Sequence, residues 1–286
     1  MVKPVRNRPL LYMMTWRCTR ACNYNCLHCS FASSPAAVNE IDTKGGMRIV
    51  DELYEMGTKW FGLSGGEPLM RKDIFEIIEH AKSLGMNVSL ITNGYYVKGD
   101  ILDNLIRNEV MTAVSLDGTE ETNDFIRGKG AYATAIKAMD NLSKGGIFDC
   151  IVTTLNKRNC AEVDHVAQVG HEYDATRVVY HNYVPVGRAQ EHLELAPTPQ
   201  QYEVVLNIIY DLMQNIKGNS ALTYIVPSSP ASLRRGVCPT LITGSTTCFL
   251  VNASSAADTW VFLKMGIFDP AALMKATGWV TSGTKR

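Results

Sequence analysis

The sequence has no surplus of charge of either sign and no long apolar run. Its 28 Lys and Arg residues balance its 28 Asp and Glu residues, so the formal net charge is zero. Proteins that bind nucleic acid usually carry a basic surplus, and we therefore expect no nucleic-acid partner. A membrane-spanning helix needs about 20 consecutive apolar residues, and no stretch of the sequence approaches that length. We therefore expect no membrane partner.

A secretory signal and the cysteine distribution of a disulfide-rich protein are also lacking. The apolar residues 10–16 follow several basic residues, but the stretch is too short for a signal sequence with its cleavage site. Four of the eight cysteines lie close together, at Cys18, Cys22, Cys26 and Cys29. Clustered cysteines without an export signal indicate metal or redox chemistry, and we expect a cytoplasmic protein.

The composition that is present is globular. Of the 286 residues 46% are hydrophobic, which is enough to bury a substantial core without covalent staples. Short apolar runs predict strands at residues 11–15, 60–63, 87–92, 112–116, 150–155 and 177–181. Amphipathic segments predict helices at residues 47–56, 73–84, 99–107, 131–143 and 161–173. This alternation is typical of parallel βαβ units, so the predicted fold class is α/β, a partial (β/α)6 TIM-type barrel of parallel strands.

The end of the chain follows a different pattern. Residues 197–216 predict a helix that opens with a Pro-Thr-Pro segment, and residues 268–276 predict a short one. The rest lacks clear alternation of strands and helices. We therefore divide the chain into a core barrel at residues 1–196 and a C-terminal helix with a short, poorly defined extension at residues 197–286.

Distinctive short motifs directly follow the first four predicted strands. They are Cys22 to Cys29, Gly65 to Pro68, Asn93-Gly94 and Asp117-Gly118. In parallel α/β barrels the carboxyl ends of the strands carry the active site, so these motifs predict one common site. Periodicity alone does not separate such a barrel from an open doubly wound sheet.

The cysteines at positions 22, 26 and 29 have C-x3-C-x2-C spacing. Iron–sulfur clusters prefer thiolate ligands, and three thiolates leave one iron of a [4Fe-4S] cluster open for a substrate. A structural zinc site, with Cys18 or His28 as the fourth ligand, is an alternative, and so is an electron-transfer ferredoxin. We expect Cys18 to point away from the site, because it lies near the end of the first strand.

In this order, the motifs resemble those of the radical SAM (S-adenosylmethionine) superfamily. The cysteine loop resembles the C-x3-C-x-aromatic-C motif with His28 in the aromatic position, and Gly65-Gly66-Glu67-Pro68 resembles GGEP. Three later segments are similar to family segments as well: Thr92-Asn93-Gly94, Ser115-Leu116-Asp117-Gly118 with Arg127-Gly128, and Gly187-Arg188. The resemblance covers roughly residues 12–187.

The resemblance implies an enzyme that reductively cleaves SAM at a [4Fe-4S] cluster to give a 5′-deoxyadenosyl radical. It implies Cys22, Cys26 and Cys29 as cluster ligands, and it implies no catalytic residue beyond the cluster. The SAM-binding residues that it implies are His28, Gly65, Gly66, Glu67, Pro68, Thr92, Asn93, Ser115 and Arg127. A reductant such as ferredoxin or flavodoxin is the implied partner.

Two branches of the family compete. The segment after Ser115 is similar to the SPASM/twitch branch, which includes enzymes of heme and pyrroloquinoline quinone biosynthesis and peptide maturases. It predicts a small-molecule or peptide substrate in cofactor biosynthesis or peptide maturation. After Pro185 the sequence has only Cys238 and Cys248 as ligands for a possible second iron–sulfur cluster, so we expect a degenerate or truncated SPASM/twitch-like extension. The alternatives are a molybdenum-cofactor GTP cyclase-like enzyme and a non-catalytic iron–sulfur electron carrier.

Overall fold

A computed structural model describes residues 12–35, 40–215, 221–225, 247–252 and 260–265. Its strands are β1 (Met13–Thr19), β2 (Trp60–Gly65), β3 (Asn87–Thr92), β4 (Met111–Ser115), β5 (Phe148–Thr154), β6 (Arg177–His181), β7 (Ala221–Ile225), β8 (Thr247–Asn252) and β9 (Trp260–Met265). They form one sheet in the order β7-β6-β5-β4-β3-β2-β1-β9-β8. Strands β1 to β7 are parallel to one another, whereas β9 is antiparallel to β1 and β8 is antiparallel to β9.

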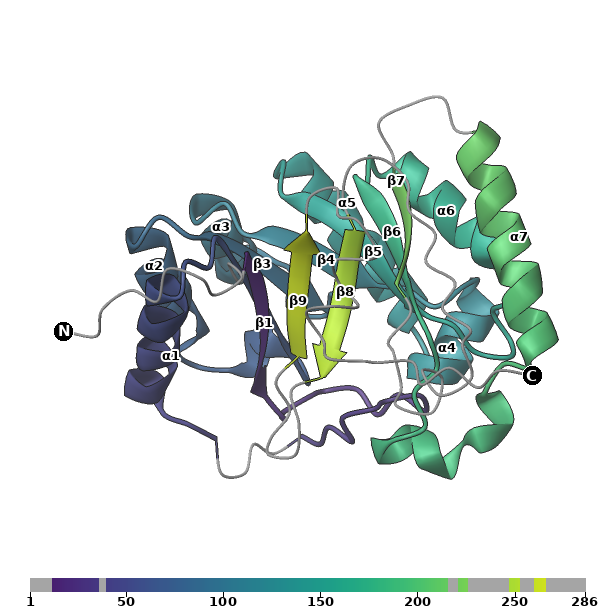
Figure 1. The fold of residues 1–286 in the computed structure, drawn as a ribbon, viewed down its shortest axis with the longest axis horizontal. Helices are drawn as coiled ribbons and strands as arrows, with labels where there is room; N and C mark the ends of the chain where they lie inside the picture. The colour runs from purple at the N-terminus through teal and green to yellow at the C-terminus, as the bar shows by residue number, and fades with distance from the viewer. Residues whose placement is uncertain (1–11, 36–39, 216–220, 226–246, 253–259, 266–286) are drawn as a thin grey trace, which may run out of the picture.

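The helices are α1 (Thr43–Glu55), α2 (Ile74–Ser83), α3 (Gly99–Arg107), α4 (Glu120–Arg127), α5 (Ala131–Lys144), α6 (Val163–Glu172) and α7 (Pro199–Asn215). Most of them cover the outer face of the sheet, whereas α4 packs against α5 and against the loop that follows β1. Three short 3-10 helices are η1 (Pro68–Met70), η2 (Gly187–Glu191) and η3 (Leu193–Leu195). Figure 1 shows α1 and α2 on the side of β1 and α6 and α7 on the opposite side, near β6 and β7. The six predicted strands and the α/β class are confirmed.

Successive side chains along each strand point alternately to the helix-covered core and to the inner face of the sheet. Phe61, Leu90, Val114 and Ile151 are fully buried against the helices. Each such side chain stabilises the fold by about 1.5–3 kcal/mol through apolar burial. Their neighbours point to the opposite face, where Ala113 and its partners form a separate small apolar cluster. The helix-covered face therefore supplies the stability, which leaves the carboxyl ends of the strands available for function.

Three features differ from the predictions. The first strand continues to Thr19, four residues beyond its predicted end. Helix α4 was not predicted, because its eight residues are mostly polar and expose little of an apolar pattern. Strands β7 to β9 lie in the tail, where no alternation was expected. The helix predicted at residues 268–276 lies outside the described residues, and among the described residues no helix is long and apolar enough to cross a membrane.

Candidate iron–sulfur and cofactor site

The loop of residues 20–35, which we call the cluster loop, carries Cys22, Cys26 and Cys29. It leaves the end of β1 and returns, because the Cys22 amide donates to the carbonyl of Ser34 at 2.8 Å. Inside the loop a turn brings the Cys29 amide to the Cys26 carbonyl at 3.2 Å. The side chains of Cys22 and Cys26 are buried, and Cys29 is half-buried. The three cysteines thus lie on one closed loop at the carboxyl edge of the sheet.

Cys18 lies apart from these three cysteines. Its buried thiol belongs to the main hydrophobic core and donates to the Ser64 carbonyl at 3.3 Å. Burial raises the pKa of Cys18 to about 12. Cys29 is different, because hydrogen bonds from Ser33 and Phe31 and the positive charge of Arg188 outweigh the effect of its burial and lower its pKa. The geometry agrees with the expectation that Cys18 points away from the loop.

The predicted Gly-Gly-Glu-Pro motif presses against the backbone of the cluster loop. The Gly66 amide donates to Thr19 and the Glu67 amide to Ala21, each at 2.7 Å. A Cβ atom on Gly66 would lie 2.2 Å from the Ala21 carbonyl oxygen, and Gly65 has a φ of +138°. Only glycine fits such a close approach. Pro68 then begins η1, so the turn after β2 is rigid.

Glu67 ties this turn to the segment after β3. Its fully buried carboxylate accepts hydrogen bonds from the Thr92 hydroxyl and the Asn93 amide, each at 2.8 Å. Burial raises the pKa of Glu67 to about 7, against the lowering effect of these hydrogen bonds. The Asn93 side chain continues the connection by donating to the Asn23 side chain at 2.8 Å. The carboxylate of Glu67 therefore hydrogen-bonds to groups of the protein itself. Through Asn93 it connects the Gly-Gly-Glu-Pro turn, the Thr92-Asn93-Gly94 segment and the cluster loop.

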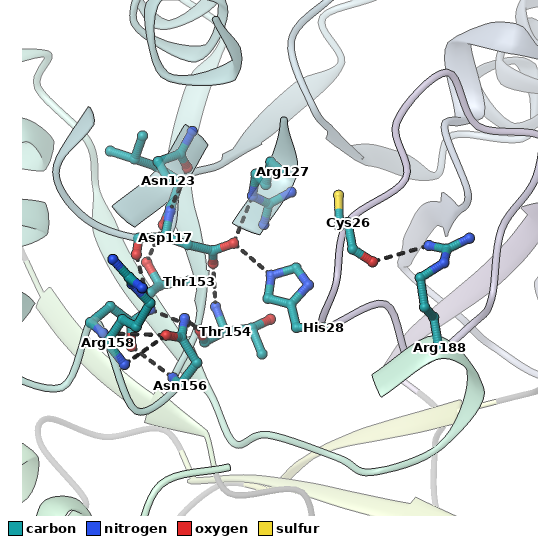
Figure 2. A network of polar contacts seen from close by, with 12 residues as sticks. Cys26, His28, Asp117, Asn123, Arg127, Thr153, Thr154, Asn156, Arg158 and Arg188 are labelled. Carbon is teal, nitrogen blue, oxygen red and sulfur yellow. Dashed lines mark hydrogen bonds and ion pairs between the residues drawn. The ribbon is translucent and has the colours of Figure 1, made fainter. Parts of the chain in front are cut away.

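A buried group of charges lies beside the cluster loop. The Asp117 carboxylate interacts with His28 Nε2 at 2.5 Å and accepts from Arg127 Nε at 2.7 Å (Figure 2). All three side chains are at most 9% exposed. Burial alone would raise the pKa of Asp117, but the charges of Arg127 and His28 hold it well below its usual value. Asp117 is therefore a carboxylate, and His28 Nε2 carries a proton.

This arrangement leaves one atom of His28 free to face a ligand. Its Nδ1 is buried and has no hydrogen-bond partner among the described residues. A buried polar atom without a partner costs about 1–3 kcal/mol. Such a cost is tolerated where a bound group supplies the missing hydrogen bond. Sequence reasoning placed His28 and the Asp117-Gly118 motif at the site but gave Asp117 no role, although its carboxylate fixes the ring of His28.

Asp117 is itself held by three elements. The Thr154 amide at the end of β5 donates to its Oδ1 at 2.8 Å. Its own amide donates to the Asn123 side chain at 2.9 Å, and Asn159 Nδ2 donates to its carbonyl at 3.0 Å. Figure 2 shows Asn123 of α4 and Thr154 at the end of β5 on either side of Asp117. The Ser-Leu-Asp-Gly segment was the only sequence signal for Asp117, and nothing marked Asn123.

The remaining predicted residues lie nearby. Thr92 and Asn93 are buried at the end of β3, and Ser115 is half-buried at the end of β4. Residues of the cluster loop and of the end of α4 line a cavity of about 380 Å³: Asn23, Tyr24, Asn25, Leu27, Phe125, Ile126, Arg127, Gly128 and Lys129. Within the described residues, no group of three His, Cys, Asp or Glu side chains is placed to hold a single metal ion. Cys238 is not described, and the side chain of Cys248 in β8 is not described either.

Comparison with curated proteins finds relatives over most of this chain. An AdoMet-dependent heme synthase of Methanosarcina barkeri is 35% identical over 211 residues, which are 72% of this chain and 59% of the relative. The mycofactocin maturase MftC of Mycobacterium ulcerans is 34% identical over 214 residues, 73% of this chain and 56% of the relative. The chain thus spans less than two thirds of the length of these relatives.

Solved structures share the fold. The Streptococcus suis protein SuiB, bound to S-adenosylmethionine, superposes with a TM-score of 0.65 at 17% identity, over 76% of this chain and 50% of SuiB. The protein anSMEcpe with bound AdoMet gives 0.62 at 19% identity, over 74% of this chain and 62% of that one. The sequence profile of the Radical SAM superfamily matches residues 16–157, which include every predicted site residue. The chain belongs to the radical SAM superfamily, and its relatives place it in the SPASM/twitch-type branch.

Proposed function

We propose that this protein is a radical SAM enzyme with Cys22, Cys26 and Cys29 as the ligands of a [4Fe-4S] cluster. When bound, the cluster supplies the electron that cleaves SAM into methionine and a 5′-deoxyadenosyl radical. The observation that carries the proposal is the cluster loop itself, closed at the carboxyl edge of the sheet against Gly66. Cys18 bonds to Ser64 in the core, which supports three ligands rather than four.

The residues around the loop fit SAM. The unpartnered Nδ1 of His28 is a buried polar atom that a ring nitrogen or amino group of adenine can hydrogen-bond. Gly65 and Gly66 let the turn after β2 pack against the cluster loop, and Pro68 fixes that turn, so we assign to these three residues backbone contacts with SAM. Glu67, Thr92 and Asn93 hold these motifs in register, while Ser115 and Arg127 are the proposed partners of the methionine carboxylate.

The protein's own residues place buried charges beside the proposed SAM site. Asp117 balances the charge of buried Arg127 and fixes the ring of His28. Because the group is held from α4 and β5, it needs no rearrangement when a ligand arrives. The site is therefore preorganised for a charged, polar cofactor.

We further propose a substrate of the kind handled by the relatives' branch, either a tetrapyrrole-type cofactor precursor or a peptide. The names of the two relatives, a heme synthase and a maturase, support this range. A reductant such as ferredoxin or flavodoxin in the cytoplasm would supply the electron. We assign residues 1–196 to the catalytic core and residues 197–286 to a SPASM/twitch-like extension. A second cluster at Cys238 and Cys248 would need ligands from elsewhere, because two thiolates do not complete a cluster.

Anaerobic reconstitution with iron and sulfide, followed by dithionite and SAM, tests the proposal. We expect 5′-deoxyadenosine to form, as measured by chromatography and mass spectrometry. Cluster absorbance should vanish in Cys26→Ala and persist in Cys18→Ala. A wild-type protein with full cluster occupancy that forms no 5′-deoxyadenosine would refute the enzyme, and loss of the cluster in Cys18→Ala would refute the three-ligand assignment.

A further inference from the structure

Residues 183–196, which join β6 to α7, pack against the cluster loop from far along the chain. We call this segment the clasp. Its Arg188 side chain donates from Nη1 to the Cys26 carbonyl at 3.0 Å and from Nη2 to the Ser33 carbonyl at 2.6 Å. One planar guanidinium thus spans two carbonyls on opposite sides of the loop, a geometry that arginine provides and lysine does not. Figure 2 shows the side chain directed at the backbone of Cys26.

The backbone of the clasp makes further bonds to the same loop. The amides of Arg188 and Ala189 both donate to the Cys29 carbonyl, at 2.9 and 3.3 Å. Gly187 makes this approach possible, since its φ is +61° and a Cβ atom would lie 2.6 Å from the Ser30 carbonyl oxygen. Together with the side-chain bonds, the carbonyls of two proposed cluster ligands are engaged by one dipeptide.

A small apolar cluster fastens the clasp. It is separate from the main core and consists of Ile126, Tyr183, Ala189 and Leu195, with Leu27 and Ala196 packed against it. Leu27 belongs to the cluster loop, and its amide donates to the Ile126 carbonyl at 2.9 Å. The Tyr183 hydroxyl donates to the carbonyl of Ala189 at 2.9 Å, which braces the turn that presents Arg188. The cluster loop therefore packs against the clasp as well as against β2.

We propose that Arg188 is a positioning residue that holds the cluster loop in its cluster-binding shape before loading and places a fixed positive charge beside the cluster afterwards. Ordering a loop costs conformational entropy, so a loop that is closed in advance binds its cluster more tightly. A nearby cation stabilises the more negative, reduced state of a cluster and so raises its reduction potential. This role rests on the proposed cluster site. Arg188 would hold the cluster loop and raise the reduction potential of the cluster.

The first test uses the apoprotein, so that it does not depend on cluster loading. We compare the rate of thiol alkylation of Cys22 and Cys26 in wild type, Arg188→Met and Arg188→Lys. Arg48→Met is the matched control, because the Arg48 side chain on α1 is 77% exposed. Loss of hydrogen bonds from a charged group costs about 1.5–3 kcal/mol, so we expect alkylation about tenfold faster or more in Arg188→Met. Thermal unfolding of each variant identifies any that fails to fold. If Arg188→Met does not fold, the alkylation rate of Arg188→Lys, which keeps the charge but not the planar guanidinium, decides whether Arg188 holds the loop.

The second test uses the reconstituted protein and measures the midpoint potential by a redox titration monitored by electron paramagnetic resonance. We expect Arg188→Met to lower the potential and to take up less iron, and Arg188→Lys to keep the wild-type potential while its loop is alkylated faster. Equal alkylation rates in Arg188→Met and Arg48→Met overturn the proposal that Arg188 holds the cluster loop. Equal midpoint potentials in wild type and Arg188→Met overturn the proposal that its charge tunes the cluster. A wild type that binds no cluster overturns the proposed function instead, while the apoprotein test still decides on the clasp.

Discussion

Replacing Asp117 with Asn removes a buried charge while keeping the size of the side chain. In the native protein the carboxylate meets N–H groups of His28, Arg127 and the Thr154 backbone at 2.5, 2.7 and 2.8 Å. An amide has only one oxygen, so it can satisfy Thr154 only by directing its NH2 group at two other donors. The buried guanidinium then has no counter-charge.

The expected loss of stability is large for this reason. Removing one partner of a buried ion pair costs about 3–5 kcal/mol. For a domain of this size about 2–4 °C of melting temperature corresponds to each kcal/mol, so the melting temperature should fall by about 6–20 °C. Circular dichroism during thermal unfolding of the apoprotein measures the effect. The matched control is Asp140→Asn, whose exposed pair with Lys144 is worth only about 0.3–0.5 kcal/mol.

The pH dependence gives this prediction a second readout. The folded pKa of Asp117 lies below its unfolded value of about 3.9, so its contribution is fully present above about pH 5 and is lost as the pH falls through the folded pKa. The difference between wild type and Asp117→Asn should be constant from about pH 8 to 5 and shrink at more acid pH. If the free energies of unfolding of Asp117→Asn and Asp140→Asn differ by less than about 1 kcal/mol at pH 7, the buried charged group does not stabilise the site as we argue.

Two further predictions concern the turn after β2. Glu67 has a raised folded pKa of about 7, so ionisation opposes folding, and wild-type stability should fall by up to about 3 kcal/mol between pH 4.5 and 7.5. Denaturant titrations of Glu67→Gln should lack this fall, and an identical pH profile in both proteins would contradict it. Gly66→Ala should lose the cluster and at least about 3 kcal/mol of stability, because its Cβ would meet the Ala21 carbonyl at 2.2 Å. The helical control Gly45→Ala should stay within about 1 kcal/mol of wild type in the same denaturant titration, and equal behaviour of the two alanine variants would refute the close approach.

The sheet could be predicted because its signals are local. A strand buried on its helix side reads as a short apolar run, as in β3 and β4, and the residue types that follow it mark the site edge. Helix α4 had a signal as well, since Thr119 precedes Glu120 and Glu121 in the manner of a helix start. That signal was overlooked because the segment has little apolar periodicity.

The pairings within the site could not be predicted from the sequence. His28 and Asp117 are 89 residues apart, and Arg188 and Cys26 are 162 residues apart. Charge and spacing say which groups need partners, but not which of many candidates the fold brings together. Arg127 illustrates this limit, because its Nε donates to Asp117, a contact that no local motif specifies.

The separation between Arg188 and the cluster loop also sets an order of events during synthesis. Ribosomes add about 5–20 residues per second, so the loop emerges roughly 8–32 s before the residue that closes it, which lies 162 residues later. Throughout that interval the nascent loop lacks its four hydrogen bonds to Arg188 and Ala189, and its thiols meet solvent and oxidants. Loading on the ribosome would therefore meet an open loop, whereas loading after release would meet a closed one, and the clasp favours delivery of iron and sulfide to the finished chain.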